Sequence, residues 1–170
     1  QYTRKIGSLK KALGRSFAMK ELRPTKQILG MHIVQDRTQK VLWLSHQKYV
    51  TKILERFNMS DAKPGSLVLP TNYRLNAKQC PKGEKENAEM RTVLYASAVD
   101  SLMYAMVYTR RDIAFVVGEV NRYMSNPGRQ QWVRVKWILR YLKRTLRVCL
   151  KYSVGKRMLE GALERPIALG

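Results

Sequence analysis

The sequence predicts an α+β protein that is mostly α-helical, with one β-hairpin followed by a helical subdomain. Three observations support this fold class. Apolar side chains recur at helical spacing over residues 4–17, 46–57, 94–124 and 130–147. Residues 28–44 instead contain two short, partly β-branched apolar runs around a polar break. Between residues 58 and 92 the regular pattern is lost, and prolines and glycines accumulate.

The composition indicates a folded chain with a large excess of positive charge. Its 170 residues are 45% hydrophobic, which suffices for one domain or two small subdomains with a core. Lysine and arginine number 33 against 12 acidic residues, giving a formal net charge of +21. Such a charge attracts nucleic acid first, anionic membranes second and acidic proteins third.

Membrane and secretion signals are not apparent in the sequence. No apolar run approaches the roughly 18 residues of a membrane span. The first residues lack the apolar segment of a signal peptide. We therefore expect a soluble, intracellular protein of the cytoplasm or nucleus, with no membrane partner. The sequence makes no prediction of the oligomeric state.

The first third of the chain predicts a helix, the hairpin and a second helix. Residues 4–17 form an amphipathic helix whose apolar face comprises Ile6, Leu9, Leu13 and Phe17. The hairpin follows, and its turn type stays open because the break lacks Asn-Gly or Asp-Gly. We expect Ser45 to cap the next helix. That helix buries Tyr49, Val50, Ile53, Leu54 and Phe57, and it carries Lys48, Lys52 and Arg56 on another side.

The remaining elements are a long linker, three helices and a tail. Residues 58–92 read as a linker or irregular crossing segment, in which Cys80 is expected to be an inert thiol. A largely buried helix covers residues 95–107, and Asp112 is expected to cap the next one. Residues 148–152 are compatible with a short strand. The predicted divisions are 1–45, 46–93, 94–147 and a disordered tail over 148–170.

The strongest functional signal is the last helix, Gln130–Arg147. At about 100° per residue, one face carries Trp132, Val135, Leu139, Leu142 and Leu146. Beside this face lie Lys136, Arg140, Lys143, Arg144 and Arg147. Like charges at these spacings repel one another, and no acidic residue occurs between Glu119 and Glu160. The pattern indicates a helix that packs on a core and faces a polyanion; a solvated surface face is the alternative.

The sequence contains binding features but no recognisable catalytic set. No Asp neighbours another acid, so no pair is available to hold two metal ions. His32 and His46 lack metal-binding spacing and are expected to be ordinary surface or partly packed histidines. Nucleotide-binding glycine loops and the GxSxG elbow are absent. We therefore expect no catalytic residue, no metal ligand and no cofactor in this chain.

Aromatic and basic residues are interleaved on the hairpin and the helices. Lysine and arginine would hold backbone phosphates without reading bases. Trp43 is a candidate for stacking, although a core position in an alternating strand is the alternative.

Several motifs carry a family resemblance over residues 4 to about 152. They include Lys26-Gln27-Ile28-Leu29-Gly30-Met31, Leu42-Trp43-Leu44-Ser45, Ile53-Leu54-Glu55-Arg56-Phe57, Tyr95-Ala96-Ser97-Ala98-Val99, Asp112-Ile113-Ala114, Arg122-Tyr123-Met124-Ser125-Asn126-Pro127 and Val135-Lys136-Trp137-Ile138-Leu139. Together they resemble the reverse transcriptase of copia-type LTR retrotransposons, a part of their Pol polyprotein, and plant members most of all.

The resemblance implies which part of the polymerase this is. Residues 4–45 correspond to the end of the palm, with Val41 to Ser45 in the place of the primer grip. Residues 46–147 correspond to the thumb, which lies along the template–primer duplex. In this family the YVDD metal-binding strand precedes the helix that matches residues 4–17. The chain alone is therefore expected not to polymerise, and magnesium is implied only for an intact polymerase.

The resemblance and the charge pattern together predict a binding surface for RNA–DNA or DNA duplex through its backbone phosphates. The expected nucleic-acid-binding residues are Leu42, Trp43, Leu44, Ser45, Lys48, Lys52, Arg56, Lys136, Arg140, Lys143 and Arg144.

Departures from the family pattern suggest a decayed transposable-element copy. Arg23, Asp100 and Arg144 stand where the family has Gly, while Leu94 and Arg111 stand where it has Pro. A buried Asp100 would cost a few kcal/mol. The alternative function is a recruited structural or interaction protein that uses the helical subdomain to bind a protein partner.

Overall fold

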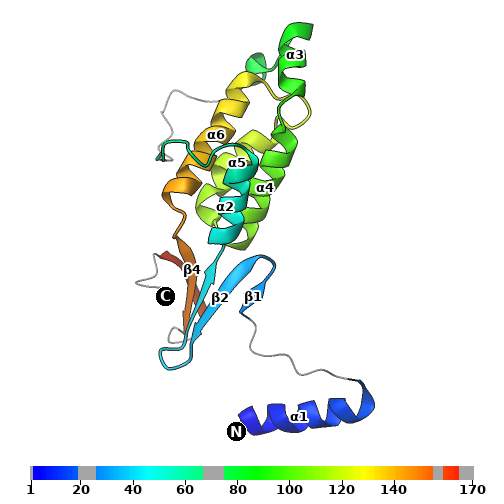
Figure 1. The fold of residues 1–170 in the computed structure, drawn as a ribbon, viewed down its shortest axis with the longest axis vertical. Coiled ribbons are helices and arrows are strands. Elements are labelled where there is room, and N and C mark those ends of the chain that lie inside the picture. Colours follow the sequence, from blue (N-terminus) through cyan, green and yellow to red (C-terminus); the bar gives the residue numbers. More distant parts are fainter. Residues whose placement is uncertain (1, 19–25, 67–74, 155–158, 165–170) are drawn as a thin grey trace.

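The structure is a computed structural model that describes residues 2–18, 26–66, 75–154 and 159–164. A bundle of helices stands on one end of an antiparallel sheet, and the first helix, α1 (Tyr2–Ser16), lies apart from both (Figure 1). The predicted class, α+β and mostly α, is confirmed. Among the described residues, no helix is both long and apolar enough to cross a membrane.

The sheet has five antiparallel strands that follow one another in chain order. They are β1 (Gln27–Ile28), β2 (Met31–Asp36), β3 (Val41–Ser45), β4 (Cys149–Val154) and β5 (Leu159–Glu164). The predicted hairpin is the pair β2–β3, in which Val34 lies opposite Trp43. Its turn needs no Asn-Gly, because the Asp36 carboxylate accepts the backbone N–H groups of Thr38 (2.8 Å) and Gln39 (2.9 Å).

The expectation of a disordered tail over residues 148–170 is wrong for its strand residues. β4 pairs with β3, with Leu44 opposite Leu150, and β5 then pairs with β4. β3 alone would leave a row of unpaired backbone groups at its outer edge, and β4 satisfies them. The short strand that the sequence suggested at residues 148–152 is thus β4.

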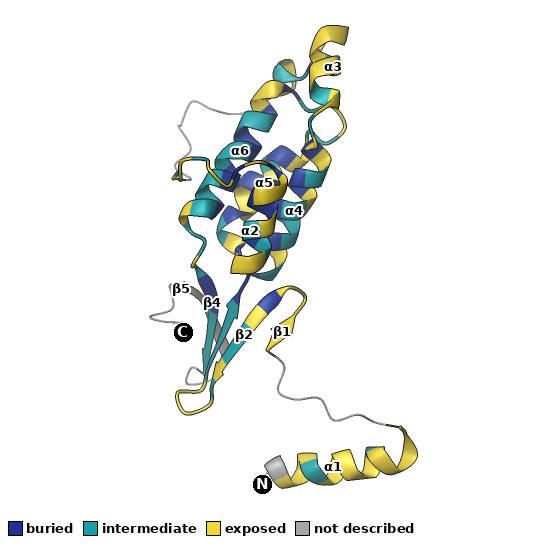
Figure 2. Ribbon diagram, viewed as in Figure 1, coloured by how far each residue is buried: buried dark blue, intermediate teal, exposed yellow. Residues whose placement is uncertain are grey.

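Four helices share one apolar core: α2 (Gln47–Arg56), α4 (Tyr95–Tyr108), α5 (Ala114–Asn121) and α6 (Arg129–Arg144). The core includes Ile53 of α2, Leu102 of α4, Val120 of α5 and Leu139 of α6. Figure 2 shows the buried residues concentrated where these helices meet. α2 contacts α4 and α6, and α5 contacts the same two helices. The predicted division at residue 94 therefore runs through a single core.

Residues 58–92 are more regular than the predicted linker. They contain a 3₁₀ turn, Ala77–Gln79, and the helix α3 (Glu84–Arg91). α3 has acidic residues in its first turn and Arg91 in its last, an arrangement that complements the helix dipole. None of its residues is buried, so the apolar periodicity that revealed the other helices is missing here.

α6 begins and ends slightly before the predicted Gln130–Arg147. Val135, Leu139 and Leu142 of the predicted apolar face are buried, whereas Trp132 and Leu146 only pack against the core. At its start, the backbone N–H of Gly128 donates to the Gln131 side chain at 3.1 Å. A Cβ atom at position 128 would collide with the carbonyl oxygen of Gln79, so the close approach of this loop requires glycine.

The departures from the family pattern occupy exposed positions. Leu94, Asp100, Arg111 and Arg144 are all exposed, and Arg23 lies outside the described residues. The expected burial cost of Asp100 is therefore wrong, because its carboxylate faces solvent on the outer side of α4.

Candidate nucleic-acid interface

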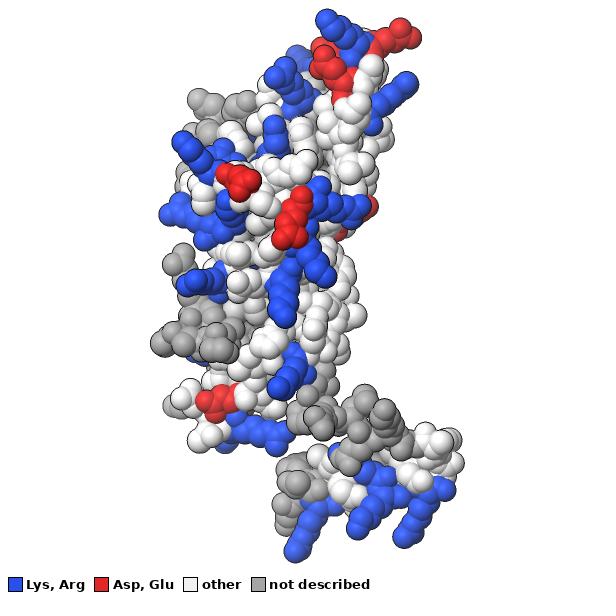
Figure 3. Space-filling view, in the orientation of Figure 1, with Lys and Arg blue, Asp and Glu red and all other residues white. Residues whose placement is uncertain are grey.

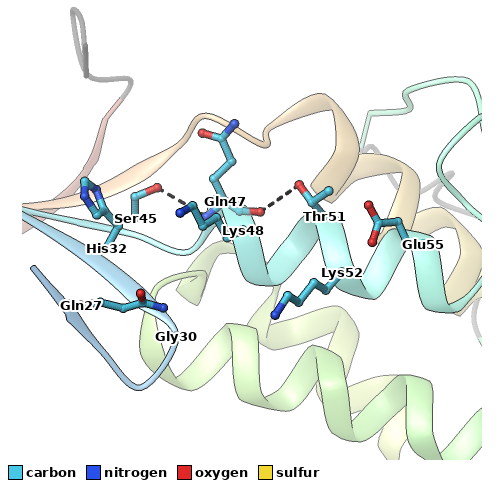
Figure 4. Close-up of a pocket in the computed structure, with 9 residues that line it drawn as sticks. All are labelled: Gln27, Gly30, His32, Ser45, Gln47, Lys48, Thr51, Lys52 and Glu55. Carbon is cyan, nitrogen blue, oxygen red and sulfur yellow. Dashed lines mark hydrogen bonds between the residues drawn. The ribbon is translucent and has the colours of Figure 1, made fainter.

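An open groove of about 610 Å³ lies between the β1–β2 hairpin and α2 (Figure 4). The hairpin contributes Gln27, Gly30 and His32, and the end of β3 contributes Ser45. α2 contributes Gln47, Lys48, Thr51, Lys52 and Glu55. The structure thus brings three predicted site residues, Ser45, Lys48 and Lys52, to one groove.

The start of α2 fixes these side chains. The helix begins at Gln47 with His46 as its N-cap, so the expectation that Ser45 caps it is wrong. Ser45 ends β3 instead, and its hydroxyl accepts the Gln47 N–H at 3.4 Å. Lys48 and Lys52 are exposed and four residues apart, which places them on one face about 6 Å apart along the helix. Glu55 adds one negative charge to the same groove.

The other predicted residues near the hairpin do not line this groove. Leu42, Trp43 and Leu44 are half-buried in β3. The ammonium group of Lys151 lies 5.2 Å from the centre of the Trp43 ring, a cation–π contact between neighbouring strands. Arg56 is exposed at the end of α2, where its guanidinium lies over the Phe57 ring.

The basic residues of α6 hold the loop that follows α2. Arg140 donates from Nε to the carbonyl of Lys63 at 2.7 Å, and its own carbonyl accepts the Gly65 N–H at 3.1 Å. Lys143 donates to the carbonyl oxygens of Ser60 and Ala62. Lys136 is half-buried and Arg144 is exposed. Two of the predicted basic residues of this helix, Arg140 and Lys143, therefore make contacts within the protein.

Positive charge nevertheless dominates the visible surface. Figure 3 shows Lys and Arg side chains over α1 and over the bundle, whereas acidic side chains are few and several lie at the α3 end. The two predicted basic sets lie on neighbouring helices, since α2 contacts α6.

A buried ion pair fixes the end of α6. Arg110 is only 2% exposed and donates from Nε (3.0 Å) and Nη2 (2.7 Å) to the two oxygens of Asp112. The Tyr141 hydroxyl donates to Asp112 at 2.7 Å, and Arg110 also bonds Thr145 after α6. Burial would raise the pKa of Asp112, but the bonds from Arg110 and Tyr141 outweigh it, so this pKa is lowered.

Asp112 is therefore not the helix cap that the sequence predicts. It lies in a 3₁₀ turn, Arg111–Ile113, and α5 starts after it with Ile113 as its N-cap. The short spacing Arg110-x-Asp112 was the signal available in the sequence, but its buried geometry depends on Tyr141 and Thr145 from α6.

His46, which the sequence predicts to be an ordinary surface or partly packed histidine, is buried. It is 2% exposed, and its ring stacks on Tyr49 with the ring centres 4.8 Å apart. Its ring nitrogens lie 3.1 Å from the Thr109 hydroxyl and 3.4 Å from the Leu29 carbonyl. Burial lowers the pKa of His46, and the contact with Leu29 only partly opposes this.

Other chemical groups do not gather into a second site. In the parts of the chain that the structure describes, no three His, Cys, Asp or Glu side chains are grouped to hold a metal ion. Cys80 and Cys149 are free thiols, and Cys80 is half-buried beside the Gln131 amide.

Comparison with known proteins shows which sequences this chain is similar to. No protein-family model and no solved structure matches the chain. The chain is 50% identical over 163 residues to the retrovirus-related Pol polyprotein from transposon TNT 1-94 of Nicotiana tabacum. This alignment covers 96% of the chain and 12% of that relative. The chain is a homologue of plant-transposon Pol polyproteins.

Two further relatives of this Pol homologue come from Arabidopsis thaliana. The Pol polyprotein from transposon RE2 is 31% identical over 134 residues, or 79% of the chain and 9% of that relative. An uncharacterized mitochondrial protein is 32% identical over 134 residues, or 79% of the chain and 52% of that relative. The chain thus spans a small part of the Pol polyproteins and about half of the mitochondrial protein.

Proposed function

We propose that this Pol homologue is the palm-end and thumb portion of a copia-type reverse transcriptase, and that it holds the template–primer duplex by its backbone phosphates. The observation that carries this proposal is the groove beside α2, where Ser45, Lys48 and Lys52 meet. The net charge of +21 and the homology to transposon Pol polyproteins support it.

The groove suits a phosphate backbone better than a base edge. Lys48 and Lys52 present two ammonium groups at successive helical turns, and ammonium groups act as point charges for phosphates. Glu55 and the glutamines add polar partners for sugar hydroxyls. Such contacts give affinity and register without sequence preference.

In this proposal the chain positions the duplex and does not itself transfer phosphoryl groups. The carboxylates and magnesium ions of that step belong to a catalytic strand outside these residues. The chain is then a remnant of a transposable element whose surface departures, such as Asp100 and Arg144, alter binding more than folding, because both are exposed.

Binding to an RNA–DNA duplex tests the proposal. Fluorescence anisotropy at low salt should show binding that weakens steeply as salt rises, since each phosphate contact releases counterions. Replacing Lys48 and Lys52 by Gln should weaken binding and make the negative slope of log K against log salt shallower by roughly 2.

A matched pair of substitutions controls for net charge. Lys82→Gln with Lys85→Gln removes the same charge at the exposed α3 end and should leave the slope nearly unchanged. Equal losses from both pairs, or equal binding to heparin, would reduce the interaction to general attraction for polyanions.

A second candidate is a structural or interaction protein, because the bundle exposes large apolar side chains, Val107 and Phe115 most of all. Val107 of α4 is 63% exposed and Phe115 of α5 is 72% exposed. Exposed apolar residues of this size are common at protein interfaces when they form a patch. A protein that elutes as a clean monomer in sizing chromatography and binds the duplex as described would count against this candidate.

A further inference from the structure

The turn between β1 and β2 is hydrogen-bonded to side chains outside the sheet through the carbonyl group of Leu29. Leu29 and Gly30 form this turn, and both have positive φ angles, +49° and +75°. The Leu29 carbonyl accepts the Tyr104 hydroxyl of α4 at 2.9 Å, and the His46 ring nitrogen lies 3.4 Å from the same oxygen. Both partners come from outside the sheet.

The two side chains that reach Leu29 are held in place by aromatic packing. The Tyr49 ring contacts both of them, with ring centres 4.8 Å from His46 and 4.9 Å from Tyr104, and the His46 and Tyr104 rings are 5.7 Å apart. Tyr108 packs against Tyr104 at 4.5 Å. The Tyr49 hydroxyl donates to the Ser101 carbonyl of α4 at 3.2 Å, which ties the cluster to the bundle.

This connection adjoins the groove described above, because Leu29 and His46 are chain neighbours of its lining residues Gly30, Ser45 and Gln47. Gly30 lines the groove from the turn, while Lys48 and Lys52 line it from α2 (Figure 4). β1 pairs with β2 over only two residues, so its ladder holds the turn weakly. The position of the β1–β2 turn, which lines the groove opposite α2, therefore depends on the contacts of the Leu29 carbonyl with Tyr104 and His46.

We infer that Tyr104, with His46, is a positioning residue that holds the β1–β2 turn at a fixed separation from α2 and thereby sets the width of the phosphate-binding groove. Because the groove receives a phosphate backbone only under the proposed function, this inference rests on that function. If the Leu29 carbonyl is released from Tyr104 and His46, the turn moves away from α2 and the groove widens opposite the two lysines.

Tyr104→Phe tests the role with the smallest change, because it removes the hydroxyl and keeps the ring. Tyr108→Phe is the matched control: its ring belongs to the same cluster, and its hydroxyl makes no hydrogen bond to any described residue. Hydrogen–deuterium exchange of residues 26–33 reports on the turn without any ligand. Exchange there includes the Ile33 N–H, which donates to Lys26 at 2.8 Å.

For Tyr104→Phe we expect exchange over residues 26–33 to rise about two- to tenfold, the effect of losing one hydrogen bond. Exchange in α6 should stay unchanged, which separates release of the turn from general destabilisation. Affinity for the RNA–DNA duplex should fall by a similar factor, while Tyr108→Phe should match the parent protein in both measurements.

The other outcomes are distinct. Unchanged exchange over residues 26–33 in Tyr104→Phe overturns the inference. The inference is also overturned if Tyr104→Phe exchanges faster but keeps full affinity for the duplex, while the separate Lys48 and Lys52 substitutions abolish binding. If the parent protein does not bind the duplex, the proposed function fails, and the role of Tyr104 in setting the groove fails with it. Faster exchange in Tyr104→Phe would still show that Tyr104 holds the turn in place.

Discussion

At the residue scale, the ion pair Arg110–Asp112 combines a buried cation with a partly buried carboxylate. The guanidinium is almost fully buried and makes two bonds to one carboxylate, which also accepts the Tyr141 hydroxyl. A buried charge left without its partner is costly, because the protein interior solvates it poorly.

Asp112→Asn should therefore lower the free energy of unfolding by roughly 3 kcal/mol. Urea unfolding followed by circular dichroism measures this difference. Asp100→Asn removes the same charge from an exposed site and should change stability by less than about 0.5 kcal/mol. Similar small effects for both substitutions would contradict a structural role for the Arg110 pair.

At the element scale, the contacts between loops and helices decide at which glycines a side chain would lower the stability of the protein. Gly128 precedes α6 and lies against the backbone of Gln79, whereas Gly118 lies within α5 with open space around it. The same substitution should therefore have opposite effects at these two positions.

Gly128→Ala should destabilise the protein by about 1–3 kcal/mol, because the new methyl group forces the 3₁₀ turn away from α6. Gly118→Ala should stabilise it by up to about 1 kcal/mol, because alanine favours a helix more than glycine does. Thermal unfolding of both variants checks the pair, and a loss of stability at Gly118 would show that α5 is packed differently.

Elements with a strong apolar period were predictable, and those fixed by distant contacts were not. The spacing of apolar residues predicts both α2 and α6, because it requires one buried face on each helix. These residues are Val50, Ile53 and Leu54 in α2, and Val135, Leu139 and Leu142 in α6. α3 buries nothing, so only its end charges mark it. β5 depends on pairing with β4, which the local sequence does not specify.

The candidate site was predictable in part for the same reason. Lys48 and Lys52 face the groove because their helical spacing places them away from the core. The contacts of Arg140 and Lys143 depend on the path of the loop through Ser60 and Lys63, which no periodicity encodes. The assignments of Leu42, Trp43 and Leu44 to nucleic-acid binding remain predictions.

For the whole molecule, the joint between the sheet and the bundle contains a buried group whose protonation opposes folding. His46 lies at this joint, and its burial lowers its pKa below the ordinary value of 6.5. The unfolded chain therefore takes up a proton near pH 6.5 that the folded protein resists. The contribution of neutral His46 to stability is fully present above this pH and is lost as the pH falls toward the folded-state pKa.

We expect the free energy of unfolding to decrease between pH 7.5 and 5.5, and to decrease less in His46→Gln. Urea titrations at the two pH values measure this difference. Asp112 does not interfere in this range. Its pKa is lowered in the folded protein, so its contribution to stability is lost only as the pH falls below about 3.8, the ordinary value for the unfolded chain. An identical pH dependence in the parent protein and in His46→Gln would show that protonation of His46 does not destabilise the folded protein.

The neighbouring positions of β3 and β4 give the chain an inserted topology. The backbone leaves the sheet after Ser45 and returns at Cys149, and these two strands pair directly, with Leu44 opposite Leu150. The whole bundle is thus the excursion of one very long hairpin, whose entry and exit lie side by side. Such an arrangement joins the bundle to the sheet through two adjacent strand ends, and the contacts of Tyr104 and His46 with the Leu29 carbonyl add a further attachment at the β1–β2 turn.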